Sequence, residues 1–118
     1  PRGQEAGMLY DSITMTDRKR LNRSGRYHPR RRDEEGFIHC SGAGAELLTV
    51  ANRFYRGADI AALEIDDAML GHMVHWEKPT HGGLTGLFPH LYGPIDAVMV
   101  ASVLAFEKDG NGNCTGLR

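Results

Sequence analysis

Two segments of the sequence place histidines beside aromatic and hydroxyl side chains at spacings that could support chemistry. The first covers residues 36–41 (GFIHCS), and the second covers residues 88–94 (FPHLYGP). Each histidine stands among apolar residues typical of a strand, where an imidazole must be hydrogen-bonded, ligated or turned toward a cleft. We therefore expect the two segments to form two walls of one site.

The alternation of side chains along a strand indicates what these histidines could do. His39 should share a face with Phe37. Phe88, His90 and Tyr92 should share a face of the second segment, which would flank the imidazole with rings suited to stacking on a base. Either histidine could donate to a phosphate or ribose oxygen, or shuttle a proton near neutral pH. The alternative for each is a structural histidine satisfied by a backbone carbonyl.

Four further residues are candidates because they adjoin these segments or a neighbouring strand. Ser41 is expected to cap the next helix, whose free amides would form an anion pocket; an ordinary N-cap is the alternative. Arg53 on that helix could supplement a phosphate site. Glu77 ends a strand that carries Trp76 and adjoins a glycine-rich loop, so it is the best candidate carboxylate. A solvated strand-end glutamate is the alternative reading.

A metal site is a rival explanation for the histidines. His72, His75, Glu77 and His81 lie close together in the sequence. However, the chain has no HExxH motif, and His72 and His75 would point to opposite sides of a strand. We therefore predict no metal ligands.

The elements expected to position these residues are mostly strands. The apolar pattern predicts strands over residues 8–14, 37–40, 60–65, 73–76 and 95–106. A weak helix over 16–22 and a second helix that ends at Gly57 are also expected. Because strands outnumber helices without regular interleaving, we expect an α+β fold with a mixed or antiparallel sheet rather than a doubly wound parallel sheet. Residues 8–106 should form one domain, with flexible ends at 1–7 and 109–118.

Composition limits the class of protein. The 118 residues suit one domain, and 41% hydrophobic and 25% charged residues are ordinary for a globular protein. No apolar run approaches the roughly 20 residues that span a bilayer, so we expect no membrane insertion. Two cysteines and no signal pattern indicate a cytoplasmic protein.

A basic segment interrupts this balanced composition. Residues 18–32 hold eight of the 14 lysines and arginines and no acid, whereas the rest of the chain is net acidic. Such a segment favours a local anionic partner, such as a nucleotide phosphate or an RNA backbone contacted between Arg18 and Arg32. The alternative is a solvated surface loop.

Five segments in order resemble the signature segments of the domain of unknown function 952 family. They are residues 36–41 (GFIHCS), 51–57 (ANRFYRG), 63–66 (LEID), 74–77 (VHWE) and 88–94 (FPHLYGP). The resemblance implies an ADP-ribosyltransferase-like fold, a split α+β sheet with a nucleotide-sized cleft. That superfamily includes NAD-dependent transferases and RNA 2'-phosphotransferases, so NAD is a candidate cofactor by analogy alone.

One departure from the family pattern concerns NAD. The family's first strand usually reads aromatic, His, Ile, Thr, whereas here Tyr10 is followed by Asp11. In related transferases the corresponding histidine or arginine holds the nicotinamide ribose. Asp11 could accept bonds from ribose hydroxyls, or it could equally indicate that NAD is not the ligand.

The sequence thus predicts an enzyme acting on a nucleotide or phosphorylated nucleoside. Its expected catalytic groups are His39, Glu77 and His90. Its expected binding residues are Asp11, Ser41, Arg53, Trp76 and Tyr92. Two alternatives remain open: a noncatalytic module that binds nucleotide or RNA phosphate through Ser41 and residues 18–32, and a metalloenzyme built on the histidines.

Overall fold

The computed structural model describes residues 7–27, 36–79 and 84–118. Its helices are α1 (Met15–Ser24) and α3 (Gly44–Phe54), and short 3-10 turns cover Asp67–Met69, Gly71–Met73 and Ala97–Met99. Its strands are β1 (Met8–Thr14), β2 (Arg26–Tyr27), β3 (Ile38–His39), β4 (Ile60–Asp66), β5 (Val74–Glu77), β6 (Phe88–Leu91), β7 (Ile95–Asp96), β8 (Val100–Leu104), β9 (Phe106–Lys108) and β10 (Cys114–Leu117).

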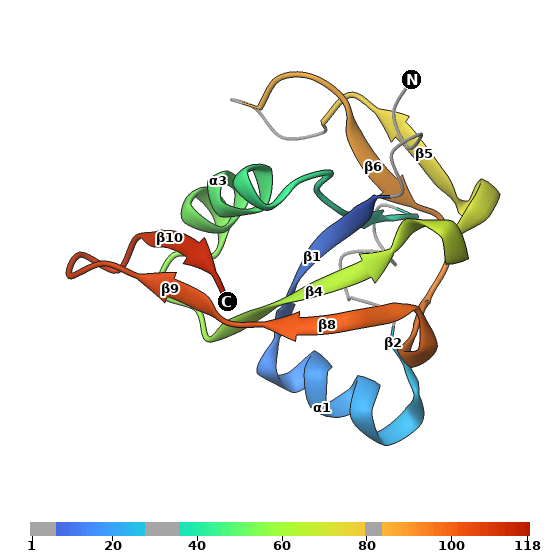
Figure 1. The fold of residues 1–118 in the computed structure, drawn as a ribbon, viewed down its shortest axis with the longest axis horizontal. Helices are drawn as coiled ribbons and strands as arrows, with labels where there is room; N and C mark the ends of the chain where they lie inside the picture. Colours follow the sequence, from blue (N-terminus) through green and yellow to red (C-terminus); the bar gives the residue numbers. More distant parts are fainter. Residues whose placement is uncertain (1–6, 28–35, 80–83) are drawn as a thin grey trace.

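Two three-stranded sheets organise these elements, in the orders β1-β4-β8 and β3-β6-β5 (Figure 1). Two smaller ladders pair β2 with β7 and β9 with β10. Every strand pair in the described ranges is antiparallel. The α+β class predicted from the sequence is therefore confirmed, and its sheets are antiparallel rather than mixed in this part of the chain.

A backbone bridge between Tyr10 and Ser41 joins the two main sheets. The amide of Tyr10 in β1 donates to the carbonyl of Ser41 at 2.8 Å, and the Ser41 amide donates back to Tyr10 at 2.7 Å. The chain that leaves β3 is thereby fixed against the middle of β1. This bridge places Asp11 and Ser12, the next residues of β1, close to the first histidine segment.

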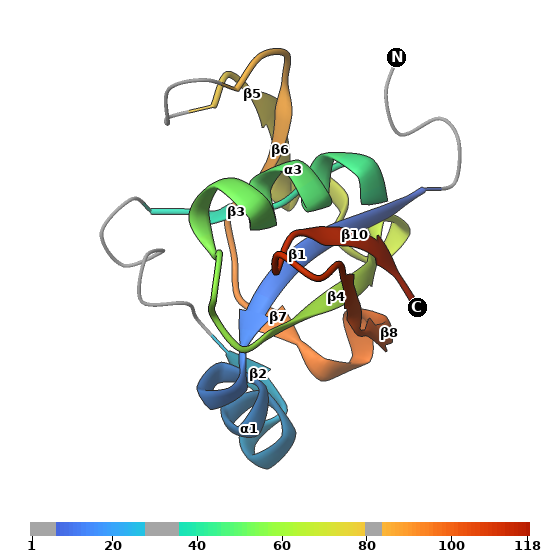
Figure 2. The same ribbon diagram turned by 90° about the vertical axis from the view of Figure 1, so that its left-hand side faces the viewer.

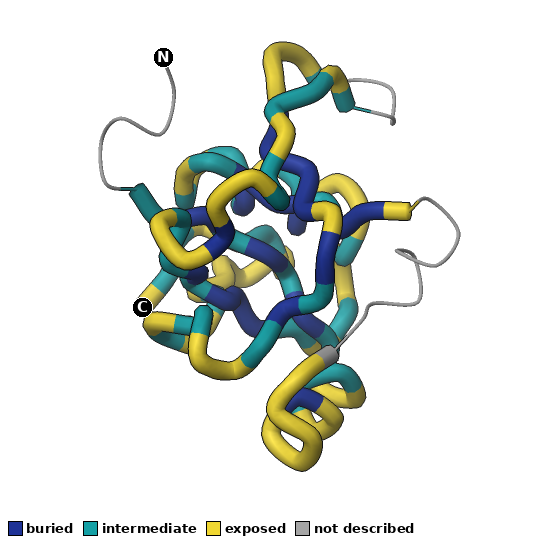
Figure 3. Tube along the Cα trace, turned by 90° about the vertical axis from the view of Figure 1, so that its right-hand side faces the viewer, coloured by how far each residue is buried: buried dark blue, intermediate teal, exposed yellow. Residues whose placement is uncertain are grey.

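The core lies where β4 crosses between its neighbours. Strand β4 is nearly continuous in apolar residues, as expected for a strand covered on both faces. The fully buried side chains include Ile13, Leu63, Ile65, Leu91 and Ile95. Helix α1 contributes only Leu21 to this core and is otherwise largely exposed, as Figure 3 shows by its colouring. In the described chain no helix is long and apolar enough to cross a membrane.

Helix α1 is longer than the weak helix expected over 16–22. Its N-cap is Thr14, whose hydroxyl accepts a bond from the amide of Asp17 at 3.2 Å. It ends at Gly25, where φ is 78°, a left-handed conformation that favours glycine. The extra length follows from these two caps, which lie outside the residues that gave the helical pattern.

The C-terminal part of the chain departs most from the sequence expectation. The apolar run 95–106 is divided among β7, a 3-10 turn, β8 and β9, instead of forming one strand. The tail expected to be flexible forms β10, which packs with α3 beside β1 (Figure 2). Asn52 of α3 causes this docking, because its amide donates to the Cys114 carbonyl at 3.0 Å and accepts from the Cys114 amide at 2.7 Å. Residues 1–6 lie outside the described ranges.

Candidate functional site

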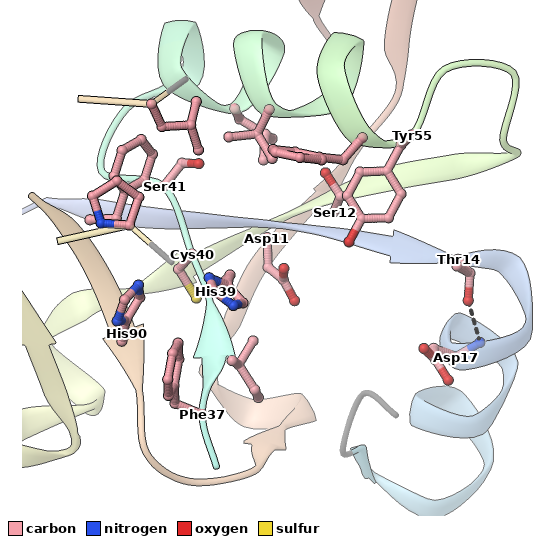
Figure 4. A pocket seen from close by; sticks show the side chains of 17 residues that line it. Asp11, Ser12, Thr14, Asp17, Phe37, His39, Cys40, Ser41, Tyr55 and His90 are labelled. Atoms are coloured by element: carbon pink, nitrogen blue, oxygen red, sulfur yellow. Dashed lines mark hydrogen bonds between the residues drawn. The ribbon is translucent and has the colours of Figure 1, made fainter. Parts of the chain in front are cut away.

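A cleft opens between β1, the β3 and β6 strands, and α3, and it encloses about 100 Å³ (Figure 4). Helix α3 lines it with apolar residues such as Leu47. Four residues expected from the sequence to form a site line this cleft: Asp11, His39, Ser41 and His90. The structure thus gathers side chains that lie up to 79 positions apart in the sequence.

Strand pairing brings the two histidine segments together. Strand β3 pairs with β6 so that His39 lies directly opposite His90, with ring centroids 5.0 Å apart. On the other side of β6, His75 of β5 is opposite the same residue. The exposed His75 is not among the residues that line the cleft. The two histidines that do line it are thus cross-strand neighbours.

An aromatic ring holds His90 in place from the cleft side. Phe37 stacks on the His90 ring with centroids 4.2 Å apart and planes at 21°. The same phenyl ring lies 4.8 Å from the ring of His39 and 5.3 Å from that of Tyr92. His39 and Phe37 therefore share a face, as the alternation of the strand predicts. This packing restricts the imidazole of His90 to one plane.

Glu77 fixes the orientation of His90. Its Oε1 lies 2.9 Å from Nδ1 of His90 and accepts a 2.5 Å bond from the Tyr92 hydroxyl. These bonds, first that of Tyr92 and then that of His90, lower the pKa of Glu77, so it is a carboxylate at neutral pH. Because a carboxylate only accepts, Nδ1 carries a proton, and in the neutral form of the ring Nε2 is an acceptor. Glu77 and Tyr92 are not among the described residues that line the cleft.

Two buried polar atoms of the cleft walls lack a hydrogen-bond partner within the described part of the chain. They are Nε2 of His90 and Oγ of Ser12, and both residues line this cleft. The whole His90 residue is only 1% exposed. A buried polar group without a partner costs about 1–3 kcal/mol, so such groups need an explanation. A ligand that completes their hydrogen bonds would supply one.

Two acidic residues are among those that line the cleft. Asp11 and Asp17 both line it, and no lysine or arginine is among its described lining residues. Asp11 is 6% exposed. Burial raises the pKa of the neighbouring Cys40 thiol well above its usual range, and the charge of Asp11 adds to this effect. Cys40 is therefore a neutral thiol rather than a nucleophile.

Ser41 does not cap the following helix, so that expectation was wrong. The N-cap of α3 is Ala43, without a side-chain hydrogen bond, and helix residues begin at Gly44. The bridge to Tyr10 keeps Ser41 extended, two residues before the N-cap Ala43. The amide of Gly42 is already bonded to Oε1 of Glu46 at 2.9 Å. Ser41 nevertheless lines the cleft.

The other expected binding residues lie away from the cleft lining. Trp76 packs on the core, and its ring would lie 2.7 Å from a Cβ added at Gly42, so a glycine is required there. Arg53 lies in the last turn of α3. Neither is among the described residues that line the cleft. Ser12, Thr14 and Asp17 are polar residues of the lining that sequence reasoning missed, and only their closeness in the sequence to Asp11 could have indicated them.

Among residues 7–27, 36–79 and 84–118, no group of three or more His, Cys, Asp or Glu side chains is placed to hold a metal ion. His72 belongs to a 3-10 turn rather than to the strand that carries His75. His81 lies outside the described residues.

Removal of the Tyr92 hydroxyl should raise the pKa of Glu77. The hydroxyl is the largest cause of the lowered value, so in Tyr92→Phe the carboxyl should titrate closer to its usual 4.5. A carboxyl whose pKa is lowered by folding stabilises the protein above the unfolded pKa, and this stabilisation is lost as the pH falls through the folded pKa. The variant should therefore show less loss of stability below pH 4.5 than the unmodified protein.

Carboxyl ¹³C NMR titration measures the Glu77 pKa directly, and urea unfolding at pH 7 and at pH 3 measures its effect on stability. Tyr10→Phe is the matched control, because Tyr10 donates instead to Glu64, at 2.9 Å. The control should leave the Glu77 titration unchanged. An unchanged Glu77 pKa in Tyr92→Phe would contradict the hydrogen-bond network described above.

Comparison with solved structures places this fold beside one bacterial protein. The crystal structure of protein CC0527 from Caulobacter crescentus is 26% identical, with a TM-score of 0.79 over 92% of this chain and 93% of that chain. Its solution NMR structure has a TM-score of 0.74 at 26% identity, covering 89% of each chain. No curated protein matches the chain.

A family model matches the part of the chain that contains the histidine segments, β4, β5 and the last three residues of β1. The match covers residues 12–103, which is more than three quarters of the 118 residues, and its description is "Protein of unknown function (DUF952)". The resemblance recognised in the five sequence segments is thereby confirmed. The chain belongs to the DUF952 family.

Proposed function

We propose that the cleft binds one ring, the ribose or the base, of a nucleotide or phosphorylated nucleoside, and that the protein is an enzyme acting on this ligand. The observation that supports this proposal is Nε2 of His90, a buried acceptor without a partner in the described chain at the wall of a cleft. Within the proposal, the fold is related to the ADP-ribosyltransferase-like superfamily, and NAD is one candidate ligand by analogy.

The dimensions and lining of the cleft support a ring-sized ligand. Its enclosed 100 Å³ is somewhat smaller than the ~150 Å³ cavity that admits a benzene molecule, so one ribose or one small ring would fill it. Phe37 provides an aromatic wall, and apolar residues of α3 provide the opposite one. Asp11 and Ser12 offer polar atoms at the same cleft, as needed for a ligand with hydroxyl groups.

His90 is suited to act as a general base. Neutral His90 would take a proton from a substrate hydroxyl or a water molecule at Nε2, and the resulting imidazolium would be stabilised by Glu77 at Nδ1. A carboxylate that holds an imidazole in one tautomer is the arrangement found in hydrolytic triads. We therefore assign Glu77 to the positioning of His90, instead of the direct ribose contact considered from the sequence. His39, 5.0 Å from His90 between ring centroids, is the second candidate catalytic group.

Thermal unfolding with a panel of candidate ligands tests the proposal. The panel is adenosine, AMP, ADP-ribose, NAD and ribose 5-phosphate. A ligand specific to the native state raises the melting temperature, and at a hundred times its Kd it adds about 2.7 kcal/mol of stability. We expect at least one nucleoside-containing member to do so, and chromatography of the same mixtures should detect its conversion.

The outcomes distinguish an enzyme from a noncatalytic binding module, and both of these from a protein that does not bind nucleotides. A shift without conversion for any member would favour the noncatalytic binding module. If no member shifts the melting temperature at millimolar concentration, the proposed ligand class is wrong. A shift that is the same with ribose 5-phosphate as with AMP would restrict recognition to the sugar phosphate.

A further inference from the structure

The cleft runs along an edge of β1 rather than over one face of its sheet. Asp11 and Ser12 are consecutive residues of this strand, so their side chains leave it toward opposite faces, yet both line the cleft (Figure 4). A cavity lined from both faces of a strand lies at the edge of that strand. One edge of β1 is paired with β4, so the cleft lies at the other edge.

Strand β3 borders the cleft in the same way. Ile38 and His39 are consecutive residues of β3, and both line the cleft. This strand is an outer strand of the sheet β3-β6-β5. The outer edges of the two main sheets therefore face each other across the cleft, and the bridge between Tyr10 and Ser41 joins them at one point.

The main-chain groups of Ser12 point toward this open edge. In an antiparallel ladder the N–H and C=O groups of alternate residues point to the same side of the strand. Tyr10 directs both of its groups to Ser41, at 2.8 and 2.7 Å, and the register of β1 with β4 is continuous from Tyr10 to Ser12. The N–H and C=O of Ser12 therefore also point away from β4 and toward the cleft.

These groups of Ser12 have no hydrogen-bond partner among the described residues, and neither does its Oγ. The positions on either side of it along the edge are already used. Tyr10 is held by the bridge, and the carbonyl of Thr14, the N-cap residue, is expected to accept the first bond of α1. Between the bridge and the helix, Ser12 is thus the residue whose main-chain donor and acceptor both remain available to a ligand.

We propose that Ser12 binds the hydrogen-bonding edge of the ligand's nucleobase through its main-chain N–H and C=O, so that the ring held in the cleft is the base. This inference rests on the proposed function and decides between its two candidate rings. Bases carry a donor beside an acceptor on one edge, such as the amino group at N6 of adenine beside N7, or the N3–H of uracil beside O4. A residue at an open strand edge offers the complementary acceptor and donor side by side.

The lining of the cleft favours a base over a ribose. Leu47, Val50 and Phe54 of α3 provide an apolar wall. A ribose carries hydroxyl groups around its ring, and those that meet an apolar wall lose their hydrogen bonds to water without replacement. A base has apolar faces and confines its polar atoms to its edges, so its face can lie on the helix while one edge meets β1.

The open edge is too short for a peptide that would add to the sheet as a further strand. Strand addition uses a row of main-chain pairs at alternate residues. Between the bridge at Tyr10 and the start of α1 at Met15, the described edge offers one such residue, Ser12. One donor and acceptor pair suits a single ring.

Amide hydrogen exchange followed by NMR tests the open edge directly. In the free protein the Ser12 amide should exchange at least tenfold faster than the amides of Asp11 and Ile13, which point to β4. Saturation with AMP or UMP, whichever binds more tightly, should slow the exchange of Ser12 at least tenfold. A Ser12 amide as protected as that of Ile13 in the free protein would overturn the inference.

Base analogues test which ring is recognised. Purine riboside 5'-monophosphate lacks the amino group of AMP, and 3-methyluridine 5'-monophosphate lacks the N3–H of UMP. Calorimetric titration should show that the analogue of the tighter-binding nucleotide binds at least tenfold more weakly than its parent, as expected for the loss of a buried hydrogen bond. Ribose 5-phosphate should also bind at least tenfold more weakly. Equal affinities of parent and analogue, or of ribose 5-phosphate and the parent, would overturn the inference.

Two variants of Ser12 test the main-chain donor from the protein side. Ser12→Pro removes the N–H, which an edge strand tolerates where the N–H faces away from its neighbour. Ser12→Ala keeps the N–H and lacks only the hydroxyl, so it is the matched reference. Ser12→Pro should bind the tighter-binding nucleotide at least tenfold more weakly than Ser12→Ala, and equal affinities would contradict the proposal. Circular dichroism verifies folding, and if Ser12→Pro does not fold, the base analogues decide.

Failure of this inference is distinguishable from failure of the proposed function. Saturable binding of AMP or UMP that does not depend on the base edge would overturn the role of Ser12 alone. Absence of binding by every nucleoside-containing ligand would overturn the proposed function instead. Tighter binding of the blocked tripeptide acetyl-Ala-Val-Ala-amide than of either nucleotide would also overturn the inference.

Discussion

Replacement of His90 by phenylalanine should weaken ligand binding in the cleft by about tenfold to a hundredfold, the effect of losing a hydrogen bond from a buried acceptor. The rings of Phe37 and His90 stack with centroids 4.2 Å apart, and a phenyl ring in place of the imidazole can keep this stacking. The shape of the cleft wall is therefore largely preserved. Turnover should fall further, because a positioned general base contributes about 10²–10⁴-fold. Calorimetric titration measures the affinity, and the rate of product formation measures the turnover.

The same substitution should leave the free energy of unfolding within about 1 kcal/mol of that of the unmodified protein, because two terms oppose each other. The variant loses the bond between Nδ1 and Glu77, whose side chain is 42% exposed. It also removes Nε2, a buried atom without a partner in the described chain. A residue whose loss harms function but not stability is the signature of a functional site.

His75→Phe is the matched control for this prediction. His75 is opposite His90 in the same sheet, but it is exposed and is not among the described residues of the cleft lining. The substitution of phenylalanine for His75 should leave ligand affinity and turnover equal to those of the unmodified protein. If His90→Phe binds ligand as tightly as His75→Phe does, His90 has no part in recognition.

Leu63→Ala should destabilise the protein by about 2–5 kcal/mol, the range for truncating a fully buried leucine. Leu63 is 0% exposed at the centre of β4, between β1 and β8. Such a loss is a large part of the free energy of unfolding of a typical domain, which is about 5–15 kcal/mol. Urea unfolding followed by circular dichroism gives the difference in free energy.

Val103→Ala is the control for the core position. Val103 is the partner of Leu63 in the register of β4 and β8, but it lies on the edge strand and is 41% exposed. Its truncation should cost less than about 1 kcal/mol, because little apolar surface is lost from the core. Equal destabilisation by the two variants would contradict the placement of the core around β4.

Local patterns in the sequence predicted the elements that depend on their own residues. The alternation of apolar residues indicated β1, β4 and β5 within one residue at either end. The pairing of Phe37 with His39 on one face followed from the period of a strand, and the ring distance of 4.8 Å agrees with it. The two histidine segments were also recognisable as a pair, because both combined buried character with a titratable ring.

Features that depend on distant contacts were not predictable from local patterns. Ser41 looked like a helix cap, but the bridge to Tyr10 holds it in an extended conformation. The tail looked flexible because it is rich in glycine and asparagine, but the contacts from Asn52 to Cys114 and from Arg56 to Asn111, together with the pairing of β10 with β9, explain its order. Glu77 was found as a candidate carboxylate, whereas its position behind His90 depends on the register of β5 and β6.

The central claim is that Nε2 of His90 receives a hydrogen bond from a nucleoside-containing ligand bound in the cleft. NMR of the ¹⁵N-labelled histidine rings during titration with AMP and adenosine measures this most directly. The account predicts a saturable shift of the His90 Nε2 resonance, with Nδ1 remaining protonated toward Glu77, and a smaller shift for exposed His75. An unchanged Nε2 resonance at saturating ligand, or saturation with a shift confined to His75, would contradict it.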